Sequence, residues 1–247
     1  MSTVRLDKLL SDNGYSRKEA GTLIKHGCVA VNGTAVKDPS AKLEREKLTS
    51  VSVNGKKLRL SEQLHLMVYK PAGVLTATED GRDATVIDLL PKEFRNIGLG
   101  PVGRLDKDVT GLVLLTTDGQ LAHRLISPRW EQFKHYTAVC EGIIDEDDIR
   151  KMKEGIPLKD FTCKGADMVL LETDAEKNEC TVDVAVCEGK YHQVKRMLGA
   201  LGHGVIRLHR RSIAGIELDK DLSEGGWREL TADETAYLYR ITEMTEA

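Results

Sequence analysis

The sequence predicts an α+β fold in which a small N-terminal module precedes a larger domain built on a mixed, largely antiparallel sheet. Short apolar runs of strand length outnumber helical patterns, and hairpin-like pairs of such runs recur along the chain. The charge is also divided unevenly. Residues 1–60 hold 12 Lys+Arg and 6 Asp+Glu, a net charge of +6, whereas residues 61–247 hold the other 24 and 33, a net charge of −9. We therefore place a boundary near residues 60–63, giving domains of residues 1–60 and 63–247. We expect the basic module to bind a polyanion, unless the asymmetry is a chance surface bias.

The bulk composition narrows the class of protein. Of the 247 residues, 40% are hydrophobic and 30% are charged, as in ordinary globular proteins. No apolar run approaches the roughly 18 residues of a membrane helix, and the N-terminus lacks the apolar core of a secretory signal. The cysteines are odd in number and form no C-x-x-C pair, which argues against a disulfide framework and a zinc site and predicts a reducing, cytoplasmic location. They are Cys28, Cys140, Cys163, Cys180 and Cys187.

The first module begins with two helical patterns. Residues 6–13 place their apolar side chains on one helix face, and an Asn-Gly pair ends this helix. Ser16 and Glu19 have the spacing of a capping box, which starts a second helix. Residues 29–36 then predict a hairpin with an Asn-Gly turn, and residues 51–55 predict another short strand and turn.

These elements resemble the S4 RNA-binding domain over about residues 3–50. The recurring marks of that family stand here as R-L-D-K at residues 5–8, S-R-K-E-A at residues 16–20 and V-A-V-N-G at residues 29–33. The resemblance implies that basic side chains on or beside the helices contact RNA phosphates, an interaction that depends on salt and does not read the bases. The residues with this expected role are Arg5, Lys8, Arg17, Lys18 and Lys25.

The larger domain begins with a strand pattern at residues 64–70, which Pro71 and Gly73 end. Residues 85–90 are a short helix candidate closed by a proline. The same kinds of signal predict a helix over residues 120–126, a strand over 134–139, an acid-capped helix over 145–154, strands over 166–171 and 180–186, a final strand over 216–218, and a helix from Thr231 to about Arg240.

The stretch GRLDKDVTGLVLLTTDG, residues 103–119, organises the larger domain. Its first half is polar and charged, whereas residues 112–115 form an apolar run typical of a strand buried on both faces. Asp106 therefore lies on a loop that a buried strand holds in place, which is where rigid scaffolds often carry chemistry. Residue type and spacing alone are also compatible with a solvated charged turn, or with a divalent cation held by Asp106, Asp108 and Asp118.

This stretch resembles the catalytic motif of the pseudouridine synthases that isomerise single uridines in ribosomal RNA. The resemblance implies that the aspartate of G-R-L-D, which is Asp106, is the catalytic residue, and that Arg104 beside it holds an RNA phosphate. Residues 70–73, Lys-Pro-Ala-Gly, are similar to the K-P-x-G mark that opens the catalytic domain of this family. For that mark, the resemblance implies a mostly architectural role.

Two later motifs extend the resemblance. Residues 134–136 match the family's K-x-Y motif, whose tyrosine lies against the target base, and this implies a stacking role for Tyr136. Residues 188–197, EGKYHQVKRM, are similar to the third motif of the family at the start of a helix. This similarity implies that Lys195 pairs with Asp106 and keeps it ionised, while Arg196 faces the RNA backbone. No catalytic role is assigned to His192.

The resemblance further implies a long curved sheet with a cleft across its middle, and the site-specific conversion of uridine to pseudouridine in ribosomal RNA. The residues Y-H-Q in the third motif, together with the basic first module, favour the small-subunit branch, since large-subunit relatives more often have N-R-Q at these positions. The reaction gains and loses no atoms, so neither a cofactor nor a metal is expected, and the sequence has no P-loop or Rossmann glycine pattern. The expected partner is ribosomal RNA or a ribosomal assembly particle, and the expected state is a monomer.

Two other classes of function stay open at this level. One is a non-catalytic RNA-binding or ribosome-assembly protein, in which the larger domain only docks. The other is a metal-dependent phosphodiesterase that uses Asp106, Asp108 and Asp118. Neither accounts for three family motifs in the right order. The sequence also leaves open whether Asp106 attacks the sugar as a nucleophile or removes a proton from it as a base.

Overall fold

The computed structural model describes residues 3–60, 63–95 and 97–245. Contacts between α-carbons divide the chain into two compact units. The first comprises the chain up to Leu64 together with Leu90–Leu99, and the second comprises His65–Leu89 and the chain from Gly100 onward. The boundary expected near residues 60–63 includes residues 61 and 62, which lie outside the described residues, so that boundary stays a prediction.

The first unit combines two short α-helices with two small antiparallel sheets in its described residues. Strand β1 pairs with β4, and the second sheet has the order β3-β2-β5-β6. The elements are β1 (Thr3–Arg5), α1 (Leu6–Ser11), α2 (Arg17–Lys25), β2 (Val29–Val31), β3 (Thr34–Ala35), β4 (Lys42–Glu44), the 3₁₀ helix η1 (Arg45–Lys47), β5 (Val51–Val53), β6 (Lys56–Lys57) and the 3₁₀ helix η2 (Lys92–Phe94).

Local sequence signals explain much of this unit. The side chain of Ser16 accepts a hydrogen bond from the Glu19 N–H at 3.2 Å, and the Glu19 carboxylate accepts one from the Ser16 N–H at 3.2 Å. The predicted capping box is therefore confirmed. Asn32 and Gly33 have φ angles of 48° and 82°, as the tight turn between β2 and β3 requires. The predicted hairpin is confirmed as well.

The second unit is built from strands β7 to β15 and helices α3 to α6. Its elements are β7 (His65–Lys70), β8 (Gly100–Pro101), β9 (Thr110–Thr116), α3 (Gly119–Ile126), the 3₁₀ helix η3 (Pro128–Trp130), β10 (Lys134–Glu141), α4 (Glu146–Glu154), β11 (Asp167–Asp174), β12 (Glu179–Val186), α5 (Gln193–Ala200), β13 (Val205–Ile213), β14 (Ile216–Glu217), β15 (Trp227–Glu229) and α6 (Ala232–Ile241).

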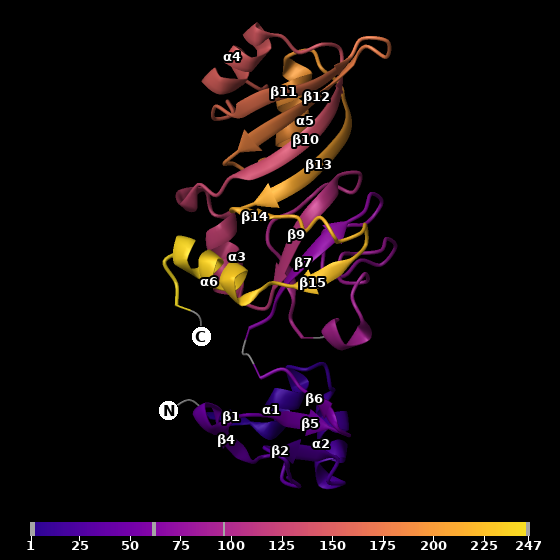
Figure 1. Ribbon diagram of the computed structural model, residues 1–247, viewed down its shortest axis with the longest axis vertical. Coiled ribbons are helices and arrows are strands. Elements are labelled where there is room, and N and C mark those ends of the chain that lie inside the picture. Colours follow the sequence, from indigo (N-terminus) through magenta and orange to yellow (C-terminus); the bar gives the residue numbers. More distant parts are fainter. Residues whose placement is uncertain (1–2, 61–62, 96, 246–247) are drawn as a thin grey trace. The chain divides into compact units, whose positions relative to one another are not determined.

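These strands form one nine-stranded sheet in the order β11-β12-β10-β13-β9-β7-β15, with β14 beside β13 and β8 beside β9 (Figure 1). Among the described strand pairs of this sheet, β9 and β13 run parallel and the others run antiparallel. The predicted α+β class, with a mixed and largely antiparallel sheet, is confirmed.

The parallel pair is a short junction between the two halves of this sheet. It consists of His209 opposite Thr110 and Arg210 opposite Gly111. Gly111 has a φ angle of 115°, and a Cβ atom added there would lie 2.2 Å from the carbonyl oxygen of Arg210. Glycine is therefore required at this position. The two halves of the sheet meet where the loop that carries Asp106 enters β9.

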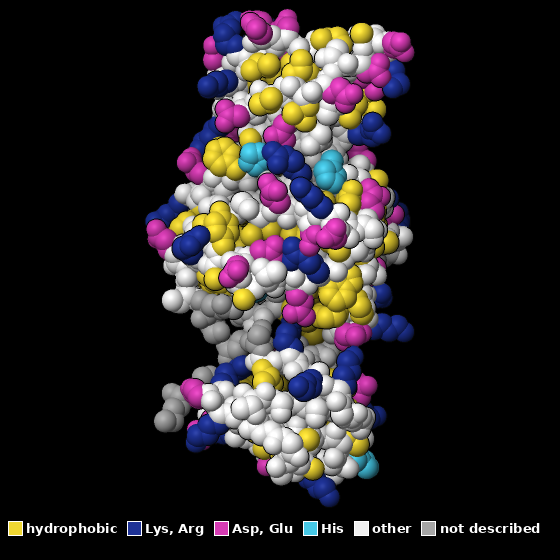
Figure 2. Space-filling view, in the orientation of Figure 1, with side chains coloured by type: hydrophobic (Ala, Val, Ile, Leu, Met, Phe, Trp, Pro, Cys, Tyr) yellow, Lys and Arg dark blue, Asp and Glu magenta, His cyan; other side chains and the backbone are white. Residues whose placement is uncertain are grey.

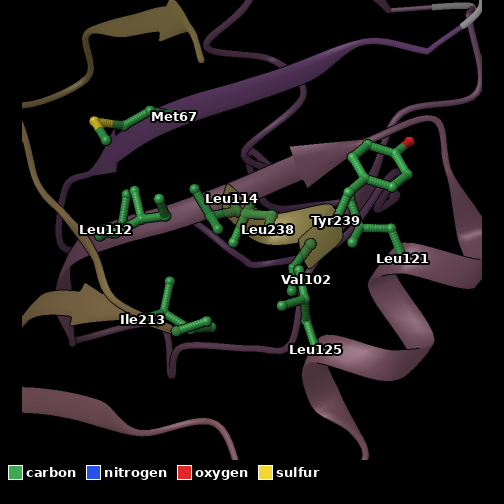
Figure 3. Packing of buried hydrophobic residues seen from close by; sticks show 11 residues of the cluster. Met67, Val102, Leu112, Leu114, Leu121, Leu125, Ile213, Leu238 and Tyr239 are labelled. Atoms are coloured by element: carbon green, nitrogen blue, oxygen red, sulfur yellow. The ribbon is translucent and has the colours of Figure 1, made fainter. Parts of the chain in front are cut away.

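Helices α3 and α6 cover the half of the sheet that contains β7 and β9. Figure 3 shows their side chains packed against those of the strands. Helix α5 packs against β13, and α4 packs against β11. The labelled members of the shared core are Met67, Val102, Leu112, Leu114, Leu121, Leu125, Ile213, Leu238 and Tyr239.

The surface of the second unit carries both signs of charge. On the face seen in Figure 2, Lys and Arg side chains are interspersed with Asp and Glu side chains, and hydrophobic side chains lie between them. The excess of acidic residues in this part of the sequence is therefore not gathered into one patch on that face. Within the described residues, no helix has the length and hydrophobicity needed to cross a membrane.

Two predicted elements of the second unit were wrong. Residues 85–90 form turns rather than a helix. The backbone at the start of this segment bonds outside it: the Leu75 N–H donates to the Ala84 carbonyl and the Val86 N–H donates to the Leu75 carbonyl, both at 2.9 Å. The strand near residues 216–218 is observed as β14, but it is not the final strand. Strand β15 follows it and pairs with β7, a partner that lies far back in the sequence.

Candidate active site

Asp106 lies in the loop between β8 and β9, and neighbouring backbone groups hold this loop in place. The buried hydroxyl of Thr76 accepts a hydrogen bond from the Leu105 N–H at 3.1 Å and donates one to the Leu105 carbonyl at 2.8 Å. The Gly73 N–H donates to the Lys107 carbonyl at 2.7 Å. The backbone on both sides of Asp106 is therefore fixed by the segment that follows β7.

Lys70 also holds this loop in place through hydrogen bonds to backbone carbonyl groups. Its fully buried ammonium donates to the carbonyl oxygens of Val109 at 2.6 Å, Pro71 at 3.0 Å and Lys107 at 3.1 Å. Burial lowers the pKa of Lys70 to about 8, although the nearby carboxylates of Asp108 and Asp106 act in the opposite direction. The lysine of the Lys-Pro-Ala-Gly motif thus clamps the loop that carries Asp106.

A pocket of about 580 Å³ opens beside Asp106. Its wall holds five Lys or Arg side chains but only two carboxylates, so its charge suits a polyanionic ligand. The charged residues and the tyrosines and histidine among its lining are Arg104, Asp106, Lys134, Tyr136, Glu188, Lys190, Tyr191, His192, Lys195 and Arg210.

Two basic side chains flank the carboxylate of Asp106. His192 Nε2 lies 3.4 Å from Asp106 Oδ1, and Lys195 Nζ lies 3.7 Å from Asp106 Oδ2. Lys195 also donates to both oxygens of Asp108, at 2.8 and 2.7 Å, and this bonding is the main reason why the pKa of Asp108 is lowered. Lys195 therefore lies between two carboxylates, closer to Asp108 than to its expected partner Asp106.

The loop before α5 places His192 against Asp106. The buried side chain of Gln193 bridges this loop, because its oxygen accepts from the Lys190 N–H at 3.1 Å and its nitrogen donates to Glu188 Oε2 at 3.0 Å. His192 adopts a left-handed backbone conformation with a φ angle of 49°, and its ring stacks on Tyr191 with 3.8 Å between ring centroids. Contacts within the motif EGKYHQ thus shape the part of the pocket wall that it forms.

Tyr136 and Arg104 line the same pocket. Tyr136 lies on β10, where its ring is largely buried, and it faces Val184 on one neighbouring strand and Arg210 on the other. Arg104 is exposed, as a side chain that meets a phosphate must be. The structure therefore brings Asp106, Tyr136, Lys195 and Arg104 to one pocket.

The other residues expected to bind RNA lie elsewhere. Arg196 forms an ion pair with Asp160, and its guanidinium lies 5.1 Å from the centre of the Phe161 ring. The remaining five are exposed and belong to the first unit: Arg5, Lys8, Arg17, Lys18 and Lys25.

Asp118 is engaged away from this pocket. It caps α3 by accepting from the Gln120 and Leu121 N–H groups at 2.9 and 3.0 Å, and its other oxygen accepts from the Tyr239 hydroxyl at 2.8 Å. In the part of the chain that the structure describes, no three His, Cys, Asp or Glu side chains are grouped so that they could hold a metal ion. The arrangement does not support a cation site made of Asp106, Asp108 and Asp118.

The sequence motifs predict no catalytic or binding role for three residues that line this site: His192, Lys134 and Arg210. One signal was available for Lys134, because it shares the alternation of β10 with the buried Tyr136 and Ala138. His192 stands within the third motif, but its position beside Asp106 depends on the fold of its loop.

Known proteins are similar to this chain along nearly its whole length. A family model described as RNA pseudouridylate synthase matches residues 64–200, and a model of the S4 domain matches residues 4–48. The chain is 40% identical over 233 residues to an RNA pseudouridine synthase of Bacillus subtilis, covering 94% of this chain and 96% of that protein. It is also 40% identical to the ribosomal small subunit pseudouridine synthase A of Vibrio vulnificus, covering 94% and 97% of the two chains.

A solved structure supports the same likeness. A crystal structure of a pseudouridylate synthase is 33% identical, with a TM-score of 0.64, and the match covers 95% of this chain and 99% of the other. The likeness therefore includes both the S4 module and the larger domain.

Proposed function

The chain belongs to the RNA pseudouridylate synthase family, and we propose that it converts one uridine of small-subunit ribosomal RNA to pseudouridine. The single observation that carries this proposal is the position of Asp106. It lies in a cation-rich pocket, between Lys195 and His192, with Tyr136 in the same wall. We include in the proposal a division into an S4-like module of residues 1–60 and a catalytic domain of residues 63–247.

The choice of RNA rests on the third motif. The relatives do not decide it, because the small subunit synthase A of Vibrio vulnificus is 40% identical and a ribosomal large subunit pseudouridine synthase B of Bacillus subtilis is 36% identical over 97% of both chains. The sequence Tyr-His-Gln at residues 191–193 favours the small-subunit branch. Large-subunit RNA is the alternative substrate. Since ribosomal RNA is the substrate, we also propose a cytoplasmic location, consistent with five cysteines that form no disulfide.

The proposed reaction exchanges one glycosidic bond for another. The N1–C1′ bond of uridine breaks, the base turns, and C5 bonds to C1′ while C5 loses a proton and N1 gains one. Asp106 acts on the sugar, either by attack on C1′ or by removing a proton. Lys195 and His192 lie against the two oxygens of the carboxylate and hold it in position for either role.

The remaining site residues bind the RNA. The target nucleotide must leave its stack to reach a carboxylate in a pocket, which costs about a few kcal/mol. Stacking on Tyr136 and a phosphate contact to Arg104 offset that cost. Arg196 and the basic residues of the first unit are proposed to contact phosphates farther along the RNA.

Isomerisation of isolated RNA tests this function. Wild type and Asp106→Asn are each incubated with unmodified small-subunit and large-subunit RNA in the presence of EDTA, and pseudouridine is mapped by carbodiimide labelling and primer extension. We expect one new stop in small-subunit RNA with wild type and none with Asp106→Asn. The matched control is Asp167→Asn, an exposed carboxylate on β11, which retains wild-type activity.

Each other outcome has a definite meaning. A stop in large-subunit RNA retains the reaction and overturns the choice of substrate. Near-normal activity of a folded Asp106→Asn protein overturns the role of Asp106. RNA binding without any stop, on isolated RNA and on assembly particles alike, favours the non-catalytic RNA-binding function.

A further inference from the structure

Two buried cations form part of the pocket wall. Lys134 on β10 is 7% exposed and Arg210 on β13 is 1% exposed, and both line the pocket beside Asp106. Buried lysine and arginine side chains are rare unless a carboxylate is paired with them. These two therefore require a physical explanation.

Neither cation is neutralised by a carboxylate within the described residues. Lys134 Nζ donates to the Gln132 carbonyl at 2.9 Å, while Arg210 Nε donates to the Leu112 carbonyl at 2.8 Å and its Nη1 lies 3.5 Å from the Arg104 carbonyl. The Nη2 group of Arg210 is buried and has no hydrogen-bond partner in the described part of the protein. Burial, together with the charge of Arg210, lowers the pKa of Lys134 to about 8.

This arrangement costs folding stability. Two like charges share a buried wall, and a buried donor that makes no hydrogen bond loses its hydration without compensation. A group that disfavours folding in this way is a candidate for function, because active sites hold polar groups ready for a ligand. The ligand of such a wall must carry acceptor oxygens or negative charge.

The strand register places these cations beside Tyr136. Lys134 and Tyr136 are two positions apart on β10, so their side chains leave the same face of the sheet, and Arg210 lies directly opposite Tyr136 on β13. All three line the pocket. A base bound against Tyr136 therefore shares this pocket with both cations.

We propose that Lys134 and Arg210 bind the carbonyl oxygens of the target uracil and stabilise the negative charge that the base carries when its glycosidic bond breaks. This inference rests on the proposed function. Cleavage of N1–C1′ leaves the electron pair on N1, from which it is delocalised onto O2 and O4. The bond re-forms from C5 to C1′, after which C5 has given up its proton and N1 has gained one, so charge and atoms balance.

Fixed cations at these oxygens act mainly on the bond-breaking step. Their attraction is stronger for a base anion than for a neutral base, so removing one of them lowers kcat more than it raises KM. Loss of one preorganised group at a developing charge typically lowers kcat by about 10²–10³-fold. For Lys134→Met we expect a fall in kcat of that order, with little change in KM.

Lys134 is the better residue to change. Its ammonium makes one hydrogen bond to a carbonyl of its own segment, whereas Arg210 also joins β13 to β9 and to the loop of Arg104. Methionine removes the buried charge and fills a similar volume, so Lys134→Met is expected to fold with at least wild-type stability. Thermal unfolding of the variant checks this expectation.

A cycle that combines a protein change with a substrate change tests the proposal. The substrate is whichever ribosomal RNA fragment the wild type isomerises, prepared with uridine, 2-thiouridine or 4-thiouridine at the target. Nuclease digestion and liquid chromatography then measure the C-linked nucleoside. Sulfur is a poorer hydrogen-bond acceptor than oxygen, so the thio substitution at a bound carbonyl slows the wild-type enzyme.

In Lys134→Met, the same thio substitution should cause at least about tenfold less loss in kcat than it causes in wild type, because the contact is already absent. Lys190→Met is the matched control. This lysine lines the same pocket, but its ammonium lies 5.5 Å from the Phe161 ring centre. The fold-loss in kcat caused by Lys190→Met should therefore multiply the fold-loss caused by the thio substitution.

The two proposals fail in different ways. If the losses multiply at both thio positions in Lys134→Met, as they do in Lys190→Met, the cation proposal is overturned and Lys134 is structural. If the wild type isomerises large-subunit rather than small-subunit RNA, the choice of substrate is overturned, while the cycle on that RNA still decides the role of Lys134.

Discussion

The ammonium of Lys195 lies 2.8 and 2.7 Å from the two oxygens of Asp108 but 3.7 Å from Oδ2 of Asp106. The side chain of Asp108 is 74% exposed, whereas that of Asp106 is 31% exposed. The more exposed carboxylate thus competes with the one in the pocket for the same lysine. Asp108 does not itself line the pocket.

This competition predicts different effects for the two partners. Lys195→Met should lower kcat by about 10²-fold or more, because Asp106 then loses a flanking cation. Asp108→Asn should keep kcat within about threefold of wild type, because Lys195 stays and its pull on Asp106 is no longer shared. Single-turnover isomerisation at saturating RNA measures both, and Lys195→Arg controls for charge. If Asp108→Asn were as inactive as Asp106→Asn, Asp108 would have to take part in the chemistry.

The buried Lys70 predicts a pH dependence of stability. Its pKa is lowered to about 8 in the folded protein, whereas a lysine in an unfolded chain titrates near 10.4. Between these values the unfolded chain binds more protons, so stability rises with pH across that window. Relative to Lys70→Met, the free energy of unfolding of wild type should therefore increase by on the order of 2–3 kcal/mol from pH 8 to pH 10.5.

Urea unfolding of both proteins across that pH range measures the difference. Lys153→Met, which removes an exposed lysine from α4, is the control and should differ from wild type by a constant amount. A constant difference for Lys70→Met as well would contradict the lowered pKa of Lys70.

Gly111→Ala should destabilise the second unit by about 3 kcal/mol or more. The backbone there has a φ angle of 115°, and the new Cβ atom would lie 2.2 Å from the Arg210 carbonyl oxygen and 2.6 Å from its nitrogen. Chemical denaturation measures the loss. Gly199→Ala in α5 is the matched control, since a Cβ atom there meets no other atom within 4 Å, and it should stabilise the protein by about 0.5–1 kcal/mol. Equal stability of the two variants would show that the strand junction can shift.

The basic first unit predicts a salt dependence of RNA binding. Each phosphate contact made to single-stranded RNA contributes about 0.7 to the slope of log affinity against log salt concentration. The double variant Arg17→Gln with Lys18→Gln should therefore reduce that slope by about 1 to 2, with a similar loss for unrelated RNA sequences. Filter binding over a range of salt concentrations measures it. The control pair Lys153→Gln with Lys177→Gln removes exposed lysines of the second unit, and an equal change in slope there would refute a specific role for the first unit.

Helix starts could be predicted from sequence because their signals are local. Ser16 with Glu19, and Thr231 with Glu234, place both partners of a capping box within one helical turn, and both boxes form in the structure. Strand β15 could not be predicted, because its pairing with β7 joins distant parts of the sequence. The apolar pattern of residues 85–90 predicts a helix, but the backbone at its start bonds to Leu75, outside the segment, and residues 85–90 form turns.

The candidate site also combines residues that local sequence motifs predict with residues whose place depends on distant strand pairing. Asp106, Tyr136 and Lys195 stand in contiguous motifs, and the structure gathers them in one pocket. Lys134 stands in the K-x-Y motif and shares the alternation of β10, whereas Arg210 looks like an ordinary surface charge when only its neighbours in sequence are considered. That the two lie in one wall depends on how β10 and β13 pair across a large separation in sequence.

The short parallel junction between β9 and β13 has a consequence for the order in which this protein folds. Thr110 and His209 lie 99 positions apart in sequence, yet they pair across the junction and share a hydrogen bond at 2.9 Å. Contacts of high sequence separation tend to form late, so we expect the antiparallel pairs β10–β12 and β7–β9, whose partners are closer in sequence, to form before β9 joins β13. Catalytic activity should then return in a later kinetic phase than strand content during refolding. Simultaneous recovery of the two signals would argue against this order.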